Sequence, residues 1–423
     1  MKMIKKPVPQ VQRQVDLIKE RVAQILATVR EEGDKALSKY SREFDNCERE
    51  NPLVTEEEIK NAYRQINATT LDDLKFAAKN IEEFARFQKE ILYDIDKEIL
   101  PGVFLGHRVI PVEACAGYVP GGRYPLPSSA LMSIIPAKVA GVKRIVACSP
   151  SGKDQESIHP ATLVAMDLSG AQEIYCMGGA QAIAALAYGT ERIKAVNLIV
   201  GPGNQYVTEA KRQVSGEVGI DFLAGPSEVL VIADSSADPG TIAVDLLAQA
   251  EHDPVARGIL LCTDEKLARA VQEEIEKYLK ILPTSKIARE AWINNGKIVL
   301  FESLEEAIDY ANQVAPEHLE IHVAEPDRIK SFLVNYGSLF VGEETAEVFG
   351  DYSSGTNHIL PTMKTASFTG GVWVGTFLKV VTHQRITEEG LRLIGPVASR
   401  LAELEGLHAH KLAADVRLEK VKN

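Results

Sequence analysis

Several features that mark other classes of protein are missing from this sequence. No apolar run approaches the roughly 20 residues that a membrane-spanning helix needs, and the basic N-terminus lacks the apolar stretch of a secretory signal peptide. The five cysteines are scattered and include no C-x-x-C pair, which argues against a disulfide framework and against a cysteine-rich zinc site. These absences predict a cytoplasmic protein that does not bind a membrane.

Basic residues are also in the minority. The 47 Lys and Arg residues face 59 Asp and Glu residues, for a net charge of −12. Proteins that bind nucleic acid usually present a basic face, so this chain is a poor candidate for that class. With 423 residues, 45% hydrophobic and 25% charged, it has the composition of a globular protein and the length of several domains. An enzyme acting on a small-molecule substrate is the expected class.

Two sets of short β-branched runs alternate with helical patterns. In the first set each run ends in a glycine-containing or Pro-Ser-Gly loop and a helical stretch follows, which predicts a parallel βαβαβ sheet. The runs of this set are 144–148, 173–177 and 196–200. The runs of the second set are 229–233, 258–262, 297–301, 319–323 and 339–341. They predict a second sheet of the same kind.

The sequence therefore predicts an α/β protein with two Rossmann-like parallel-sheet domains and helical N-terminal and C-terminal extensions. Residues 10–90 read as helices, and the tail is helical again from Thr387. The predicted division is an N-terminal arm (1–16), a discontinuous first α/β domain (17–117 with 229–370), a second Rossmann-like domain (118–228) and a helical tail (371–423).

The loops of the first set could hold a dinucleotide. Gly201-Pro-Gly203 is half of a dinucleotide fingerprint, but Tyr206 occupies the place of its third glycine, so a simple tight turn explains it equally well. Three such loops on one rim of a sheet could hold a pyrophosphate on helix N-termini, with Gln181 and Asn204 as neutral hydrogen-bonding neighbours. Tyr118 precedes a Pro-Gly-Gly turn that could wall a nucleotide ring or could only link two domains.

Three further segments carry nitrogen and oxygen donors. Gln249 and His252 are three residues apart on a predicted helix, Asp351 and His358 stand in the polar loop 350–358, and Glu405 and His410 stand in the tail. Gln249, His252, Asp351 and His410 would suit zinc or a similar divalent ion. The pair Gln249 and His252 could instead form helix-end hydrogen bonds, and spacing alone does not show that the four residues meet.

One more segment carries an acid beside an imidazole. The adjacent Glu317 and His318 could serve separate proton transfers in one cleft, or could be a solvated acid beside a helix-end histidine. The histidines without a partner pattern are predicted to be structural or exposed. They are His107, His159, His322 and His383.

Taken in order along the chain, these segments resemble the histidinol dehydrogenase family. The matching stretches are GYVPGGRYPLPSSALMSIIPAKVAGV (117–142), MGGAQAIAALAYGT (177–190), GPGNQYVTEAK (201–211), DFLAGPSEVLVIAD (221–234), DLLAQAEHDP (245–254), APEHLEI (315–321), GDYSSGTNHILPT (350–362) and EGLHAHK (405–411). The resemblance covers nearly the whole chain.

The resemblance implies the oxidation of L-histidinol to L-histidine through a bound aldehyde, the last steps of histidine biosynthesis, with two NAD per substrate. It implies a zinc ion that positions the substrate's nitrogens, held by Gln249, His252, Asp351 and His410. His318 would be the base that removes the hydroxyl proton, and Glu317 would activate the water that attacks the aldehyde.

The same resemblance implies the binding residues and a homodimer. Tyr118, Gln181 and Asn204 would contact NAD, which makes 118–228 the NAD-binding domain. The substrate would be contacted by Ser227, Gln249, His252, His318, Asp351, His358, Glu405 and His410. The tail 371–423 would be a dimerisation element, with Glu405 and His410 reaching into the site of the partner.

Three alternatives stay open. Residues 365–377, 413–417 and the Pro-Gly-Gly-Arg-Tyr turn look closer to relatives that act on other small alcohols, including sulfonated diols, for which Arg123 would be a suitable contact. A zinc hydrolase would use Glu317, His318 and zinc without a nucleotide. A non-catalytic zinc-binding or nucleotide-binding protein would be indifferent to the loss of either residue.

Overall fold

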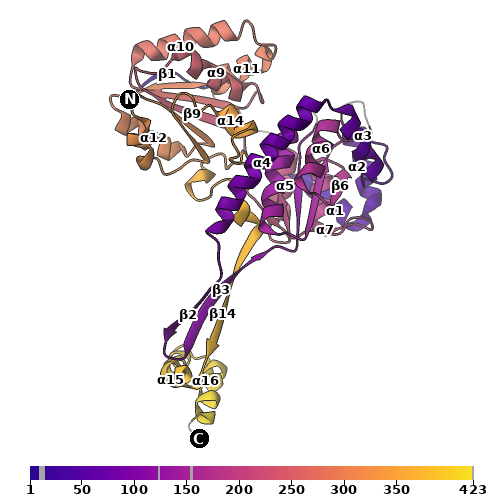
Figure 1. Cartoon of the computed structure of the whole chain (residues 1–423), viewed down its shortest axis with the longest axis vertical. Coiled ribbons are helices and arrows are strands. Elements are labelled where there is room, and N and C mark those ends of the chain that lie inside the picture. Colours follow the sequence, from indigo (N-terminus) through magenta and orange to yellow (C-terminus); the bar gives the residue numbers. More distant parts are fainter. Residues whose placement is uncertain (9–14, 122–123, 153–155, 422–423) are drawn as a thin grey trace.

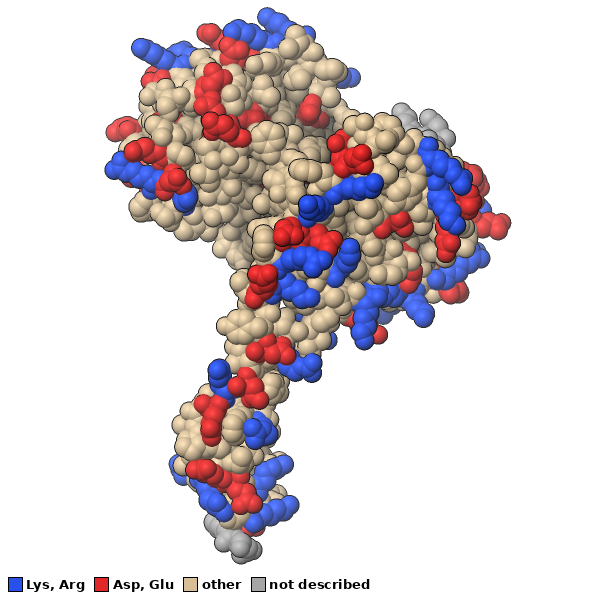
Figure 2. Space-filling view, viewed as in Figure 1, with Lys and Arg blue, Asp and Glu red and all other residues tan. Residues whose placement is uncertain are grey.

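The computed structural model describes residues 1–8, 15–121, 124–152 and 156–421, and consists of two α/β domains that lie side by side above a long stalk (Figure 1). No helix within those ranges is long and apolar enough to cross a membrane. On the face shown in Figure 2, basic and acidic side chains are interspersed over both domains and the stalk.

One domain is built on a six-stranded sheet with the order β1-β11-β10-β9-β12-β13. Five of its strands are parallel: β9 (Glu228–Ala233), β10 (Arg257–Cys262), β11 (Lys297–Leu300), β12 (His318–His322) and β13 (Ser338–Val341). All six residues of β9 are buried, as expected for a central strand covered on both faces. From the predicted N-terminal arm, β1 (Lys2–Lys5) pairs antiparallel with β11 at one edge.

Helices cover both faces of this sheet. On one face the core contains side chains of α9 (Pro239–Ala250), α10 (Glu265–Tyr278) and α11 (Ser285–Asn295). On the other it contains side chains of α12 (Leu304–Val314) and α13 (Pro326–Ile329), which a 3-10 turn (Lys330–Phe332) continues. The short helix α14 (Glu347–Tyr352) follows β13.

The other domain is built on a five-stranded parallel sheet with the order β6-β5-β4-β7-β8. Its strands are β4 (Ala114–Tyr118), β5 (Arg144–Ser149), β6 (Glu173–Cys176), β7 (Leu198–Val200) and β8 (Gly219–Ile220). In both domains the first parallel strand lies between the second and the fourth. Ligands of such sheets bind where the carboxyl ends of the first and fourth strands meet.

Two layers of helices cover the five-stranded sheet. The core on one face includes side chains of α3 (Glu56–Gln65), α4 (Ala68–Glu90), α5 (Pro127–Ala140) and α6 (Pro160–Ser169). The core on the other includes side chains of α1 (Val15–Glu32), α2 (Asp34–Asp45), α7 (Gly179–Tyr188) and α8 (Gln205–Val214). Both predicted sheets are thus present.

The structure corrects the predicted domain division. The N-terminal helices α1 to α4 pack on the five-stranded sheet, and β4 is its central strand, so most of residues 17–117 do not belong with 229–370. An apolar stripe such as Val22, Ile25 and Val29 on α1 requires burial against some surface, but it does not specify which sheet supplies that surface.

The stalk is a three-stranded antiparallel sheet with the order β14-β3-β2. It joins β2 (Ile95–Leu100) and β3 (Val103–Pro111) to β14 (Leu378–Ile386), and it ends in α15 (Glu388–Leu404) and α16 (His408–Lys420) (Figure 1). The predicted tail 371–423 is therefore α-helical only from Glu388, after the N-cap Thr387. It is preceded by a short 3-10 helix (Val374–Phe377) and by the strand β14.

Candidate active site

Glu317 and His318 stand at the amino end of β12, and both are buried. The Glu317 carboxylate accepts a hydrogen bond from the backbone N–H of Glu228 (2.9 Å). The Nδ1 atom of His318 lies 3.2 Å from the carbonyl oxygen of Glu228, and this contact is a hydrogen bond in the tautomer that carries the hydrogen on Nδ1. The Nε2 atom is then the unprotonated nitrogen, and it is buried without a hydrogen-bond partner among the described residues.

Burial acts oppositely on these two side chains. It raises the pKa of Glu317 well above its usual value, although the N–H of Glu228 partly opposes this. It lowers the pKa of His318, against the charge of Asp351. Both shifts favour the uncharged form. An uncharged imidazole with a free nitrogen can accept a proton from a substrate at neutral pH.

Helices α9 and α14 add further oxygen and nitrogen donors beside His318. The side-chain amide nitrogen of Gln249 is oriented to donate to Oε1 of Glu347, 2.9 Å away. The same carboxylate oxygen lies 3.5 Å from Nδ1 of His318. One ligand atom from each of His318, Glu347 and Asp351 lies within 4.8 Å of the others. Burial and the charge of Asp351 raise the pKa of Glu347 well above its usual value. A cation would relieve this crowding of acids, so the oxygen and nitrogen donors here fit a divalent ion.

The other substrate residues predicted in the two domains surround this group. His358 lies with Nδ1 3.8 Å from Oδ1 of Asp351 and with Nε2 3.4 Å from Oγ of Ser129. His252 follows α9 and acts electrostatically on His358, whose pKa is lowered mainly by burial. Ser227 directly precedes Glu228. Because Ser129 belongs to α5, the site lies where the two domains meet.

Two predicted residues are not brought to this site. Glu405 ends α15 and His410 lies in α16, both are exposed, and these helices lie at the far end of the stalk (Figure 1). Of the four predicted metal ligands, one chain therefore gathers Gln249, His252 and Asp351 but not His410.

The predicted nucleotide residues line a separate cavity of about 400 Å³ in the other domain. Tyr118, Gln181 and Asn204 all line it, near the carboxyl ends of β4, β6 and β7. The Tyr118 hydroxyl accepts a hydrogen bond from the backbone N–H of Gly179 (3.1 Å). The Asn204 side chain accepts from the N–H groups of Tyr206 and Val207 and so caps α8.

The backbone around this cavity suits a phosphate-bearing ligand. Helices α7 and α8 both begin at its wall, and helix N-termini attract phosphate groups. The loop after β7 runs close to β4, and at Gly201 (φ 123°) a Cβ atom would collide with the carbonyl oxygen of Tyr118. The glycine therefore allows the close approach of the two strand ends.

Sequence reasoning missed two residues of these sites. Glu347 is four residues before Asp351 and shares its helix face, a spacing hidden by the interpretation of 350–358 as a loop. Asp45 lines the cavity beside Tyr118 and Asn204 and accepts a hydrogen bond from Nε2 of Gln181 (3.1 Å). Burial raises the pKa of Asp45 to about 6, against hydrogen bonds from Gly178 and Gln181. No signal near Asp45 in the sequence points to a ligand.

Comparisons with known proteins agree with this arrangement. A family model described as histidinol dehydrogenase matches residues 9–418. A histidinol dehydrogenase homolog of Shouchella clausii is 46% identical over 403 residues, 95% of each chain. Histidinol dehydrogenase of Methanothermobacter thermautotrophicus is 47% identical over 396 residues, 94% of this chain and 92% of that one.

The fold agrees as well. The crystal structure of histidinol dehydrogenase from Elizabethkingia anophelis superposes with a TM-score of 0.93 at 38% identity, covering 99% of this chain and 95% of that one. Sequence and architecture match along the whole length, including the tail that one chain holds away from its own site. This chain is therefore a member of the histidinol dehydrogenase family, a family of oxidoreductases.

Proposed function

We propose that this protein oxidises L-histidinol to L-histidine through a bound aldehyde, with two NAD and a zinc ion, as a cytoplasmic enzyme of histidine biosynthesis. The observation that carries the proposal is the buried Nε2 atom of His318, which has no hydrogen-bond partner among the described residues, in a residue that adjoins Glu317 and lies among nitrogen and oxygen donors. A base and a second proton acceptor at one place are what two successive oxidations of one carbon require.

His318 takes the hydroxyl proton in the first oxidation. Its Nδ1–H is directed to the carbonyl oxygen of Glu228, which fixes the ring with Nε2 as the acceptor. NAD, when bound, would supply the hydride acceptor for each of the two steps. Glu317 acts in the second oxidation, where its carboxylate takes a proton from the water that adds to the aldehyde.

Residues of this chain suit both zinc and NAD. Gln249, His252 and Asp351, together with His410 of a second copy, would hold the zinc, which when bound grips the substrate's nitrogens and retains the aldehyde between the two steps. Tyr118, Gln181 and Asn204 would hold NAD in the cavity beside the N-termini of α7 and α8. Retention matters because a released aldehyde would be lost before the second oxidation.

A homodimer with shared active sites completes the proposal. The strand β14 and the helices α15 and α16 expose large apolar side chains, such as Val380, Leu401 and Leu404, which a second copy of this chain would cover. Glu405 and His410 would then contact the substrate and metal of the other protomer.

The test is to count the NADH formed per molecule of L-histidinol consumed by the zinc-loaded protein. Two NADH per histidinol are expected. Turnover of a sulfonated diol but not of histidinol would assign the diol as the substrate. The diol is kept as an alternative because a relative from Mesorhizobium japonicum, 46% identical to this chain, is named only a histidinol dehydrogenase homolog. Its candidate contact Arg123 lies outside the described residues. Hydrolysis without NADH would support the zinc hydrolase.

A further inference from the structure

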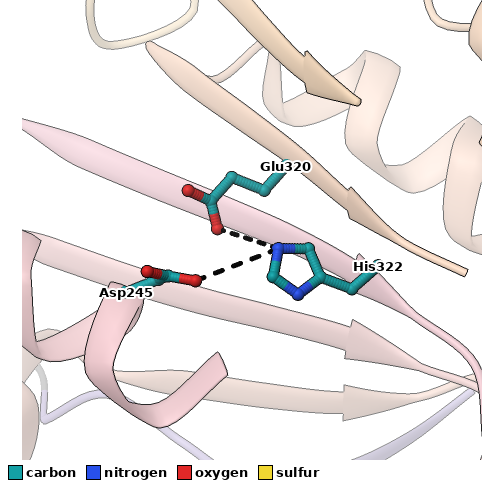
Figure 3. Close-up of side chains that lie close together, drawn as sticks. All are labelled: Asp245, Glu320 and His322. Atoms are coloured by element: carbon teal, nitrogen blue, oxygen red, sulfur yellow. Dashed lines mark ion pairs between the residues drawn. The ribbon is translucent and has the colours of Figure 1, made fainter. Parts of the chain in front are cut away.

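A second polar group lies behind the candidate active site, in the same layer of the six-stranded domain. Alternate side chains of a strand share one face, so His318, Glu320 and His322 of β12 all face α9, while Leu319 and Ile321 pack on the opposite face. On α9, Asp245 and Gln249 lie one turn apart. Gln249 and His318 belong to the active site, and Asp245, Glu320 and His322 form the second group (Figure 3).

The second group is buried and incompletely satisfied. Asp245 is 8% exposed, Glu320 0% and His322 2%. The Nε2 atom of His322 lies 3.4 Å from Oε2 of Glu320 and 3.9 Å from Oδ2 of Asp245 (Figure 3). Neither nitrogen of His322 has a hydrogen-bond partner among the described residues, and neither do those two carboxylate oxygens. A buried polar atom without a partner destabilises the folded chain, because its lost hydration is not replaced.

We propose that Asp245, Glu320 and His322 bind a second divalent cation, of the zinc or manganese class, separate from the active-site ion. One imidazole nitrogen and two carboxylate oxygens are ligands that such ions take. Ligands about 2.0–2.2 Å from zinc in a tetrahedron lie roughly 3.3–3.6 Å apart, so the observed spacing needs only small shifts.

The surrounding charges favour a cation over a shared proton. Two carboxylates face one imidazole, and the charge of Glu343 acts on both Asp245 and His322. A single proton would satisfy one pair of these atoms, whereas a divalent ion would satisfy one oxygen from each acid and the imidazole together. The other oxygen of Glu320, Oε1, already accepts the N–H of Glu347 (2.9 Å).

The ion would act as a structural link. It would tie α9 to β12, and through the bond from Glu320 to the N–H of Glu347 it would fix the start of α14. This helix carries Glu347 and Asp351 into the active site, so the second ion would position those acids without touching substrate.

The test is the number of metal ions per chain in the full-length protein reconstituted with Zn²⁺, measured by elemental analysis after removal of free ion. The expected content is two in the wild type and one in His322→Gln. Asp351→Asn, which alters only the active-site group, keeps the second ion. The control His383→Gln, a histidine exposed on the stalk, keeps both.

Equal metal content in wild type and His322→Gln overturns the inference and leaves a protonated network in its place. A wild type with a single ion that His322→Gln loses and Asp351→Asn keeps supports this site while contradicting the active-site zinc. If His322→Gln does not fold, anomalous scattering from wild-type crystals at the zinc edge decides the question. A peak among Asp245, Glu320 and His322 is expected, and no peak there overturns the proposal.

Discussion

At the residue scale, burial shifts the pKa values of two neighbouring side chains, Glu317 and His318, in opposite directions. Burial favours the neutral form of both His318 and Glu317, so the histidine is ready as a base while the acid resists ionisation. The N–H of Glu228 is placed to stabilise the Glu317 carboxylate once it forms. The proposed mechanism uses His318 first and Glu317, once it is ionised, second.

Glu317→Gln tests this division of labour. We expect alcohol oxidation to fall less than about tenfold and aldehyde oxidation to fall roughly 100-fold or more, because an amide cannot take a proton from water. Rates of NADH formation with L-histidinol and with its aldehyde, measured separately, give the answer. His318→Gln is the matched variant and should impair the alcohol step instead, and an equal loss of both steps in Glu317→Gln would refute the assignment.

Asp45→Asn tests the acid in the cavity that is proposed to bind NAD. The pKa of Asp45 is about 6 when folded against 3.8 ordinarily, so its ionised form costs stability at pH values above 6, and the cost disappears below about 4. The variant should be up to about 3 kcal/mol more stable than wild type at pH 7.5 and equal to it near pH 4. Thermal unfolding at both pH values measures this.

The control for that variant is Asp72→Asn, which changes a side chain that is 75% exposed on α4. It should leave the melting temperature close to that of wild type at both pH values. A stability gap for Asp45→Asn that does not narrow as the pH falls would mean that the charge of Asp45 is not its cause.

At the element scale, helix α9 positions residues of both polar groups, and its first turn is held by one side chain. Asp238 is the N-cap and accepts a hydrogen bond from the N–H of Thr241 (2.8 Å). Because Asp245 and Gln249 lie further along the same helix, the start of α9 helps to set where both of them lie.

Asp238→Ala should lower the free energy of unfolding by about 1 kcal/mol, because it leaves an N–H group of the first turn without an acceptor. Urea denaturation measures the change. Asp238→Asn keeps the capping oxygen and should cost only a few tenths of a kcal/mol. If both variants are equally destabilised, the cap is not the reason.

The loop after β7 offers a second test at this scale. Gly201→Ala adds a Cβ atom that collides with the Tyr118 carbonyl, whereas Gly216→Ala has the same kind of positive φ (106°) but nothing within 4 Å of the added atom. We expect Gly216→Ala to cost about 1–2 kcal/mol of backbone strain and Gly201→Ala at least about 2 kcal/mol more. Equal urea midpoints for the two variants would contradict the close strand approach.

At the scale of the whole molecule, the stalk separates the tail from the site that the two domains form. The proposed second copy of the chain would cover the exposed apolar side chains of β14, α15 and α16 and would receive Glu405 and His410. A shared active site makes a specific prediction about mixed dimers.

His318→Asn and His410→Asn should each be inactive alone, and their co-refolded mixture should recover about a quarter of the wild-type activity. Random pairing makes half of the dimers mixed, and each mixed dimer has one site with both histidines intact. NADH formation by the mixture measures the recovery, with each variant refolded alone as the control. No recovery would mean that one chain supplies both residues to its own site.

The sequence by itself determined the local elements and the kinds of chemistry. Buried β-branched runs such as 229–233 and 258–262 lie in strands within a residue or two of prediction, since period and residue type are local properties. Twelve residues were predicted to bind substrate, metal or NAD or to act in catalysis. All of them except Glu405 and His410 lie in one of the two sites described above.

Tertiary structure alone decided which parts meet. Helices α1 to α4 pack on the sheet that the sequence did not assign to them, and residues 378–386 form a strand because β3 supplies a partner for them. The cluster of Asp245, Glu320 and His322 exists because β12 turns one face toward α9, and nothing in the sequence near His322 indicates it. Amphipathic patterns and polar side chains state what a segment must contact, but only the folded chain selects the surface or the partner, because that choice depends on packing between residues far apart in sequence.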